Sequence, residues 1–482
     1  MTGKSDPQIG ARIRKLRLQR RLSQTDLAAA LGISTSYLNL IEHNRRKITV
    51  PLLFKLAGYF GVEPGDLVDG DEARIVGDLM EMFGEDLFAD SDLTNHDIRD
   101  FAHSNPGVAR AILHLYDRYR AVASHRQAEG DTPAGGQPGS HAGGEAADGA
   151  PFHLATDRIS DFIQENANYF PVLEEAAERV RADIDNAADT FEAGLKTYLV
   201  NVFGLDWRLA SLPSGIARKL EPAGNKLLVS EIMPPESAIF AAAHQLGLLA
   251  AVREIDGIIA EASLPEGDAP DLARNALAAY FAAALIMPYD PFCRMARDYR
   301  YDIERLARRF GASFEQVCHR LTTLQRPGLQ GIPMHLVRTD IAGNISKRFS
   351  LSGIQIPRHS GACPRWNVYA AFLQPDRINI QISEMPSGEQ YFCIARTITK
   401  GDYRHNAPRR HFAIGIGCAM IHAREMVYSD GFDLTNSTHV VPIGVGCRIC
   451  PRMECGQRAH PPANHRFRLD EAMRPESLYT MM

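Results

Sequence analysis

The stretch LSQTDLAAALGISTSYLNLIEHNRR, residues 22–46, limits the fold of this chain more than any other segment. Ser23 is suited to accept the free backbone N–H groups at the start of a helix. Apolar residues follow at helical spacing on one face, namely Leu27, Ala28 and Leu31. Gly32 can adopt the positive φ of a helix C-cap, so the pattern predicts a short helix that ends there.

A second short helix is predicted directly after this glycine. Ser34 is a suitable N-cap, and we expect an apolar stripe of Leu38, Leu40 and Ile41 to be buried. Two short helices joined by a glycine-centred turn make a helix-turn-helix, whose second helix can enter the major groove of DNA. The caps, the turn and the spacing therefore agree on a DNA-binding unit.

The distribution of charge also favours DNA binding at this end of the chain. Residues 1–60 hold 11 Lys and Arg and 3 acidic residues, whereas the whole chain has a formal net charge of −5. The excess of positive charge is thus confined to the N-terminal segment, which suits contact with phosphates. A helical packing module with a solvated basic face is the alternative explanation.

Residues 9–67 resemble the repressor-type helix-turn-helix family of bacteria and phages. The resemblance implies a buried ion pair between Arg17 and Glu42, and base contacts at the start of the second helix. The residues that we expect to contact DNA are Gln24, Thr35, Ser36, Tyr37, Asn39, Asn44, Arg45 and Arg46. Because one such unit reads only half of a two-fold site, we expect a homodimer on a double-stranded DNA operator.

Length and composition bound the remainder of the chain. About two to four domains are expected for 482 residues. No apolar run approaches the roughly 18 residues of a membrane span, and the N-terminus has no signal-peptide core, so we expect a cytoplasmic bacterial protein without a membrane partner, at the nucleoid when bound to DNA. All eight cysteines follow residue 292, which predicts reduced thiols or metal ligands in the C-terminal half.

Five segments can be distinguished, and together they predict a multidomain protein. Residues 1–70 form the all-α helix-turn-helix domain. Residues 71–125 are an amphipathic helical connector, which either adds to the core or forms a dimerisation arm. Residues 126–151 are Gly, Ala, Pro and polar, so a flexible linker is expected. Residues 152–325 look mainly helical, and residues 326–482 look α+β.

The mainly helical segment resembles the metallopeptidase-like domain that is fused to DNA-binding domains in bacterial regulators. A candidate strand at Lys226–Val229 precedes an apolar helical stretch, Ser237–Leu248, and a second such stretch lies at Tyr280–Pro288. In that family the first helix carries H-E-x-x-H, in which both His bind zinc and the Glu activates water. The resemblance therefore directs attention to the residues at these positions.

Only the first zinc ligand of that motif is present. His244 matches it, but Gln245 replaces the catalytic acid and Leu248 replaces the second His. One neutral His without a partner cannot hold zinc or generate hydroxide near pH 7. We therefore expect His244 to be structural, no catalytic residue to remain, and the protein not to be an enzyme.

Residues 326–482 predict an α+β domain with an antiparallel sheet. Strand-like alternation occurs at Met334–Arg338, Ile378–Ile382 and Tyr391–Ile398, and a helix-like segment follows at Gly417–Glu425. The turn-rich loops between them could border a small-molecule pocket.

Three cysteines lie close together in GCRICPRMECGQRAHP, residues 446–461. A C-x₂-C pair can direct both thiolates at one ion from a tight turn. The candidate metal ligands are Cys447, Cys450, Cys455 and Cys363, with Cys418 or His460 as substitutes for the last. Zinc is expected before an iron–sulfur cluster, and redox-active thiols and plain structural cysteines are the alternatives.

Arginines are frequent beside apolar positions of the same segment, Arg396 and Arg410 among them, and most are expected on the solvated surface. Arginine forks suit phosphates and carboxylates. The candidate ligand-binding arginines are Arg365, Arg448, Arg452 and Arg458.

With GACPRWN at 361–367 and PIGVGCRICPRMECGQRAHPP at 442–462, nearly the whole chain resembles the short-chain fatty acyl-CoA regulator family. These are bacterial transcription factors with an N-terminal DNA-binding domain, a degenerate metallopeptidase-like middle and a Cys-containing C-terminal domain. The resemblance implies control of genes for acetyl- or propionyl-CoA metabolism, with the acyl-CoA as effector.

The leading hypothesis is therefore a dimeric, ligand-responsive transcription regulator. A metal- or redox-sensing regulator that uses the C-terminal cysteines is the alternative. An active regulator-peptidase is a third reading, and the missing Glu and second His argue against it.

Overall fold

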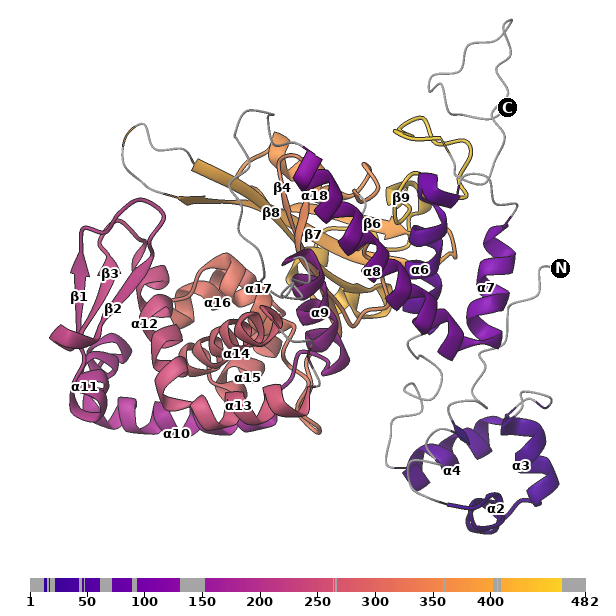
Figure 1. The fold of residues 1–482 in the computed structure, drawn as a ribbon, viewed down its shortest axis with the longest axis horizontal. Coiled ribbons are helices and arrows are strands. Elements are labelled where there is room, and N and C mark those ends of the chain that lie inside the picture. Colours follow the sequence, from indigo (N-terminus) through magenta and orange to yellow (C-terminus); the bar gives the residue numbers. More distant parts are fainter. Residues whose placement is uncertain are drawn as a thin grey trace, which may run out of the picture. The chain divides into compact units, whose positions relative to one another are not determined.

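The structure is a computed structural model that describes residues 13–14, 17, 22–42, 46, 48–60, 72–88, 93–130, 152–262, 264, 267–358, 361–401, 405 and 409–461. The chain divides into two compact units, Met1–Tyr116 and Asp117–Met482. Figure 1 shows the elements of both units, and each unit is described by itself.

The first unit contains the predicted helix-turn-helix. Its helices are α2 (Gln24–Leu31), α3 (Thr35–Glu42) and α4 (Val50–Phe60). The Ser23 side chain accepts a hydrogen bond from the Asp26 N–H in a capping box, and Gly32 has φ of 69° at the C-cap of α2. These two caps confirm the predicted start and end of the first helix.

The buried stripe of the second helix differs from the prediction at one position. Leu38 and Ile41 are buried in a core that they share with Leu27 and Leu56. Leu40 was expected in this stripe, but 38% of it is exposed. The prediction was wrong because residues two apart on a helix point to different sides, so Leu40 cannot share the face of Leu38.

Three further helices lie in the segment that the sequence predicted as a helical connector, and the last of them crosses the boundary between the two units after Tyr116. They are α6 (Glu72–Phe83), α7 (Asn95–Ser104) and α8 (Pro106–Gly130), with a short 3₁₀ turn, η1 (Asp86–Phe88), after α6. Phe88 packs its ring against the rings of Phe83 and Tyr116. Helix α8 extends to Gly130, so the first residues of the predicted 126–151 linker are helical, and residues 131–151 lie outside the described residues.

The helical part of the second unit surrounds a buried central helix. Its helices are α9 (Phe152–Glu165), α10 (Pro171–Ala187), α11 (Phe191–Phe203), α12 (Pro235–Ala250), α13 (Val252–Glu261), α14 (Ala269–Ile286), α15 (Tyr289–Asp298), α16 (Ile303–Phe310) and α17 (Phe314–Leu321). Helix α14 packs against α10, α12 and α9. Its long buried run, which includes Phe281 and Leu285, explains the apolar stretch seen in the sequence.

A small three-stranded sheet flanks these helices, and only one of its three strands was predicted from the sequence. The predicted strand is present as β3 (Lys226–Ser230), and it pairs with β1 (Asp206–Ala210) in parallel and with β2 (Arg218–Glu221) in antiparallel fashion. Strands β1 and β2 were not predicted, because they are short and mostly half-buried or exposed, with little hydrophobic alternation.

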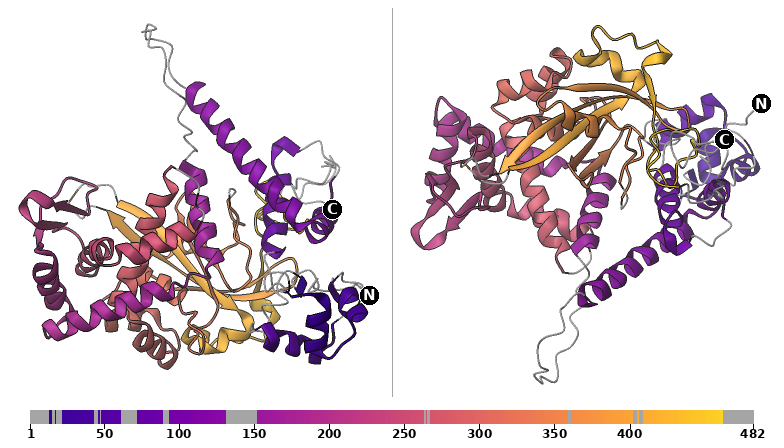
Figure 2. Two further views of the ribbon diagram at one scale, coloured as in Figure 1. Left: turned by 60° about the horizontal axis from the view of Figure 1, so that its bottom comes forward. Right: turned by 90° about the horizontal axis from the view of Figure 1, so that it is seen from above.

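The C-terminal part of the second unit is built on a six-stranded sheet with the order β5-β4-β8-β7-β6-β9. Its strands are β4 (Met334–Asp340), β5 (Ile345–Ser350), β6 (Asn379–Glu384), β7 (Gln390–Gly401), β8 (Arg409–Ala419) and β9 (Val440–Pro442). The sheet is antiparallel as predicted except at β9, which runs parallel to β6. Figure 2 shows that this sheet and the small β1–β3 sheet lie in different regions of the unit.

The predicted helix at Gly417–Glu425 was wrong over its first part. Residues 417–419 continue strand β8, and only Met420–Glu425 forms a 3₁₀ helix, η4. A Cβ atom at Gly417 would come within 2.5 Å of the Phe392 carbonyl oxygen on β7 and 2.7 Å of the His335 ring on β4. Close approach of neighbouring strands therefore explains this glycine, and tertiary packing outweighed the local helical pattern.

The two faces of the large sheet pack against different parts of the chain. On β7, Phe392 and Ile394 belong to the core shared with the helices, whereas Cys393 and Ala395 belong to a second core. This second core includes the short helix α18 (Asn367–Ala370). Because the first core runs without interruption from α10 to β8, the helical part and the sheet form one compact unit.

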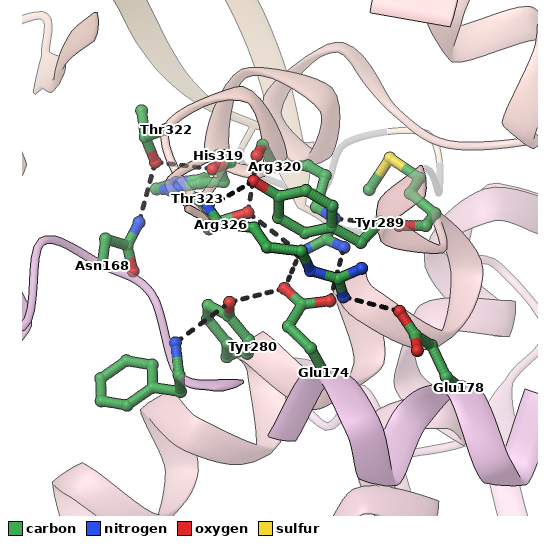
Figure 3. A network of polar contacts seen from close by, with 12 residues as sticks. Asn168, Glu174, Glu178, Tyr280, Tyr289, His319, Arg320, Thr322, Thr323 and Arg326 are labelled. Carbon is green, nitrogen blue, oxygen red and sulfur yellow. Dashed lines mark hydrogen bonds and ion pairs between the residues drawn. The ribbon is translucent and has the colours of Figure 1, made fainter. Parts of the chain in front are cut away.

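A buried ion pair joins the helices at the centre of that unit (Figure 3). Arg320 on α17 binds both carboxylate oxygens of Glu174 on α10, at 2.6 and 2.9 Å, with side-chain exposures of 0% and 1%. Tyr280 of α14 donates a hydrogen bond to the same carboxylate, and Arg320 also binds the Met287 carbonyl oxygen. Every charged group is thus satisfied, which burial of this kind requires.

Within the described residues, no single helix is both long and apolar enough to cross a bilayer, while the bent pairs α12–α13 and α14–α15 meet the criteria of length and composition only.

Replacing Arg320 by Met should lower the free energy of unfolding by about 3–5 kcal/mol, because the Glu174 carboxylate would remain buried without a counter-charge. Urea denaturation of the full chain measures the change. The control is Arg179→Met, because Arg179 is 64% exposed in its pair with Glu254 and its loss should cost less than about 1 kcal/mol. Equal effects of the two substitutions would contradict the structural role given to Arg320.

Candidate functional site

The exposed face of α3 carries the residues that the sequence assigned to base contacts. Thr35, Ser36 and Asn39 are exposed, and Tyr37 is half-buried. The opposite face, with Glu42 at its end, is buried in the core of the first unit. The second helix therefore presents short polar side chains to solvent, which suits insertion into the major groove.

A buried ion pair fixes this helix in place. Arg17 binds Glu42 through Nε and Nη2, at 2.6 and 3.0 Å, as the resemblance implied. Gln24 donates to the same carboxylate at 2.7 Å, and Asn39 donates to Gln24 at 3.3 Å. Burial alone would raise the pKa of Glu42, but the hydrogen bonds from Arg17 and Gln24 hold it below its ordinary value. Two predicted contact residues are thus held by the ion pair beneath them.

The predicted phosphate contacts after α3 are described only in part. Arg46 is exposed, with its guanidinium 5.8 Å from the centre of the Tyr37 ring. Asn44 and Arg45 lie outside the described residues. The roles of these residues in DNA contact stay predictions.

A cavity of about 930 Å³ lies within the second unit, between its helices and its large sheet. The walls come from α9, α12, α14 and α17 on one side and from β5, β7 and the start of β8 on the other. Seven Lys and Arg residues and three acidic residues line it, and three of the seven (Arg320, Arg348 and Arg396) pair with Glu174, Asp157 and Glu304 outside the lining, which leaves Arg218, Lys347, Lys400 and Arg410. Its apolar lining includes Ile159, Ile163, Phe240, Leu272, Ala276 and Leu336. The cavity therefore suits an anionic ligand with a substantial uncharged part.

The sheet end of the cavity carries a basic cluster around one carboxylate. Glu315 of α17 accepts from Arg338 at 2.9 Å and from Lys347 at 3.4 Å, and it also binds Lys400. Burial alone would raise the pKa of Glu315, but its hydrogen bond with His319 and the charges of both lysines hold the pKa well below its ordinary value. One carboxylate thus faces three cations, and both lysines keep more than 40% of their side chains exposed.

The residue that the sequence aligned with the first His of the H-E-x-x-H motif lies at the helical end of the same cavity. His244 of α12 is 6% exposed, and its Nε2 is 3.1 Å from the Asn275 carbonyl oxygen on α14. Burial lowers the pKa of His244 to about 4, with a further contribution from the charge of Arg218. The ring is therefore neutral near pH 7.

The residue that replaced the catalytic acid has a defined contact. Gln245 accepts a hydrogen bond from Arg218 Nε at 3.0 Å. Arg218 is half-buried at the cavity wall, and burial lowers its pKa. Among the residues that the structure describes, no group of three or more His, Cys, Asp or Glu side chains is arranged to hold a metal ion.

The two segments that carry the predicted metal-ligand cysteines are joined by a backbone hydrogen bond. The N–H of Cys363 donates to the Val445 carbonyl oxygen, two residues before Cys447. Burial raises the pKa of Cys363, and the nearby Cys447 and Cys450 thiols add to the shift. Burial likewise raises the pKa of Cys450, with contributions from Cys455 and Cys447. The thiols suit zinc or iron–sulfur chemistry, but in the described segments they do not converge as a preformed site.

Two of the predicted ligand arginines bind backbone in this loop. Arg458 donates to the carbonyl oxygens of Cys447 and Cys450, at 2.6 and 2.8 Å. Arg452 donates to the Ile443 carbonyl oxygen at 3.1 Å and to the Glu384 side chain at 3.3 Å. Arg458 thus closes the cysteine loop on itself, while Arg452 holds the loop against the end of β6 and the residue that follows β9.

The remaining arginines are distributed differently from the prediction. The residues that line the large cavity do not include Arg365, Arg448, Arg452 or Arg458. They do include Arg396 and Arg410, which the sequence placed among mostly solvated arginines. Lys347, Lys400 and Arg218 were not singled out at all. The sequence offered one indication of this basic wall, the adjacent Lys347 and Arg348 in ISKRFS. That segment forms strand β5, which was itself not predicted.

Comparisons with known families cover most of the chain. Residues 13–67 match the model "Helix-turn-helix", residues 210–322 match "IrrE N-terminal-like domain", and residues 323–479 match "Short-chain fatty acyl coenzyme A regulator, C-terminal". The three matches follow the order of the N-terminal helices, the helical part of the second unit and the large sheet.

Relatives of similar length share more than a third of the residues. The chain is 36% identical to the HTH-type transcriptional regulator RamB of Mycobacterium tuberculosis, over 96% of each protein. It is 38% identical to the propionyl-CoA carboxylase regulator of Cereibacter sphaeroides, also over 96% of each. A solved Mycobacterium tuberculosis transcriptional regulator matches with a TM-score of 0.64 and 39% identity, over 68% of this chain and 99% of that one.

Proposed function

This chain belongs to the short-chain fatty acyl coenzyme A regulator family, and we propose on that basis that it is a sequence-specific DNA-binding transcription regulator whose effector is a short-chain acyl-CoA. A relative named as a propionyl-CoA carboxylase regulator supports acetyl- or propionyl-CoA metabolism as the regulated pathway. The observation that carries the ligand assignment is the large basic cavity of the second unit.

The charge pattern of that cavity fits the two chemically different parts of an acyl-CoA. The nucleotide end of the ligand carries several phosphate charges. The ammonium groups of Lys347 and Lys400 share the single carboxylate of Glu315, so their positive charge exceeds what that carboxylate can neutralise. The pantetheine arm and the acyl group are uncharged, and they match the apolar lining formed by α9, α12 and α14. The phosphates therefore bind at the sheet end in this proposal.

DNA recognition is assigned to the exposed face of α3 and to the basic residues that follow it. Thr35, Ser36, Tyr37 and Asn39 read base edges, while Arg46 and the preceding Arg45 bind phosphates. The protein binds a two-fold operator as a homodimer. Its location is the bacterial cytoplasm, at the nucleoid when it is bound to DNA.

The peptidase-like part has no hydrolytic role in this proposal. Gln245 cannot act as a general base, because a neutral amide does not accept a proton from water. His244 Nε2 already lies against a backbone carbonyl oxygen, so this nitrogen is a donor and not a metal ligand.

A metal- or redox-sensing regulator that uses the C-terminal cysteines is the second candidate function. Cys363, Cys447, Cys450 and Cys455 come from two segments whose backbones pair. A metal ion or iron–sulfur cluster bound by these thiolates would connect the two segments, and its binding energy would count as folding energy of this region.

The DNA-binding roles can be separated by salt dependence. Arg46→Ala should weaken binding to operator and non-operator DNA alike and reduce the slope of log K against log salt by about 0.9, because one phosphate contact is lost. Ser36→Ala should instead change the preferred bases and leave the slope unchanged. Fluorescence anisotropy at several salt concentrations measures both. A change of base preference in the Arg46 variant, with an unchanged slope, would show that the roles are wrongly assigned.

The double variant Lys347→Gln, Lys400→Gln should bind propionyl-CoA roughly tenfold to a hundredfold more weakly, because charge-assisted hydrogen bonds to phosphate are lost. Calorimetric titration of the full chain measures the affinity. Lys196→Gln, on the exposed surface of α11, is the matched control and should bind normally. Unchanged affinity in the double variant would exclude this end of the cavity as the phosphate site.

Cys450→Ser should lower the amount of bound zinc or iron in protein purified anaerobically, and it should reduce the thermal stability of the second unit while DNA binding is retained. The control is Cys293→Ala, because Cys293 is buried in the helical core, remote in sequence from the cysteine cluster. Elemental analysis gives the stoichiometry. Wild-type protein that contains no metal and responds fully to acyl-CoA would overturn the metal assignment.

A further inference from the structure

We propose that the degenerate peptidase centre has become a binding subsite for the pantetheine arm of the effector, in which His244 accepts a hydrogen bond from the ligand and Arg218 donates one to it. This inference rests on the proposed function and assigns the helical end of the same cavity. It gives the residues that replaced the catalytic machinery a defined task in ligand recognition.

His244 has one ring nitrogen that the protein leaves unused. The Asn275 carbonyl oxygen can only accept, so the proton of the neutral ring lies on Nε2 and the lone pair lies on Nδ1. Nδ1 is buried without a hydrogen-bond partner, and His244 lines the cavity. A buried acceptor without a donor costs free energy. A ligand that brings an N–H or O–H group to this point would remove that cost.

Arg218 supplies the complementary donors at the same end of the cavity. Its Nε is held by Gln245, which leaves the terminal nitrogens of the guanidinium group for other acceptors. Gln245 is neutral, so it orients Arg218 without cancelling its charge. A Glu at this position, as in an active peptidase motif, would form an ion pair with Arg218. The replacement of the catalytic acid thus preserves a cationic donor at the cavity wall.

A pantetheine arm matches this pair of groups. It contains secondary amides and hydroxyls, which offer both the donor that Nδ1 requires and carbonyl oxygens for Arg218. The surrounding wall is made of small or apolar side chains, among them Phe240, Ala241, Ala276 and Ala279. Such a surface can pack against the arm and a short acyl group without competing for hydrogen bonds. Phosphate groups instead find their cations at the sheet end.

The test uses the two side chains that each reproduce one nitrogen of histidine. In His244→Gln the amide nitrogen can take the place of Nε2 and keep the bond to Asn275, while the acceptor at Nδ1 is lost. In His244→Asn the amide oxygen can take the place of Nδ1 and keep the acceptor. The probes are propionyl-CoA and adenosine 3′,5′-bisphosphate, which carries phosphates but no pantetheine, titrated calorimetrically into the full chain.

We expect His244→Gln to bind propionyl-CoA about tenfold more weakly, because a ligand donor would lose its partner, and to bind adenosine 3′,5′-bisphosphate as the wild type does. His244→Asn should retain most of the propionyl-CoA affinity. Gln245→Glu should weaken propionyl-CoA alone, because Arg218 would then be paired within the protein.

Other results would overturn the inference in distinguishable ways. If His244→Gln bound propionyl-CoA normally, or lost affinity for both probes equally, the subsite would be wrong while the proposed function stood. If the wild-type chain bound neither probe, the proposed effector itself would be wrong. Equal thermal stability of the His244 variants separates loss of a contact from loss of the fold.

Discussion

The buried charge of Arg320 places a strict demand on the second unit. A guanidinium group at 0% exposure must be neutralised and fully hydrogen-bonded, and Glu174, Met287 and Thr323 meet that demand. The requirement ties α17 to α10 and to the end of α14. On the same helix, Glu315 and His319 lie at the cavity, one turn apart. The ion pair that secures the helical core therefore also sets where the basic cluster stands.

The peptidase-like helices line one side of the cavity, and Gln245 stands at the position of the acid in the H-E-x-x-H motif. Gln245 and His244 each have a defined hydrogen bond, to Arg218 and to the Asn275 carbonyl oxygen. The first unit relies on a comparable arrangement. There Arg17 and Glu42 form a buried ion pair. Gln24 donates a hydrogen bond to Glu42, and the exposed Asn39 donates one to Gln24, so the pair is linked to the surface of α3.

Local signals in the sequence predicted local structure well. Ser23 and Gly32 lie within one short segment, where caps and helical spacing determine the contacts directly. The Arg17–Glu42 pair was expected from the family resemblance and not from spacing. The strand at 417–419 was missed because its conformation depends on Phe392 and His335, which are distant in sequence. The cavity could not be predicted for the same reason. Its charged groups come from segments between Arg218 and Arg410, and no motif connects them.

The continuous core of the second unit has a consequence for how such regulators can be recombined. The family matches meet between residues 322 and 323, yet side chains on both sides of that point, such as Val317 and Leu336, share one apolar interior. A chimera joined there would combine core side chains from two different proteins, and these side chains would not be complementary in shape. Exchange of effector specificity between relatives is better attempted by replacing the whole segment from α9 onward. The helices and the sheet that share the core then come from the same protein.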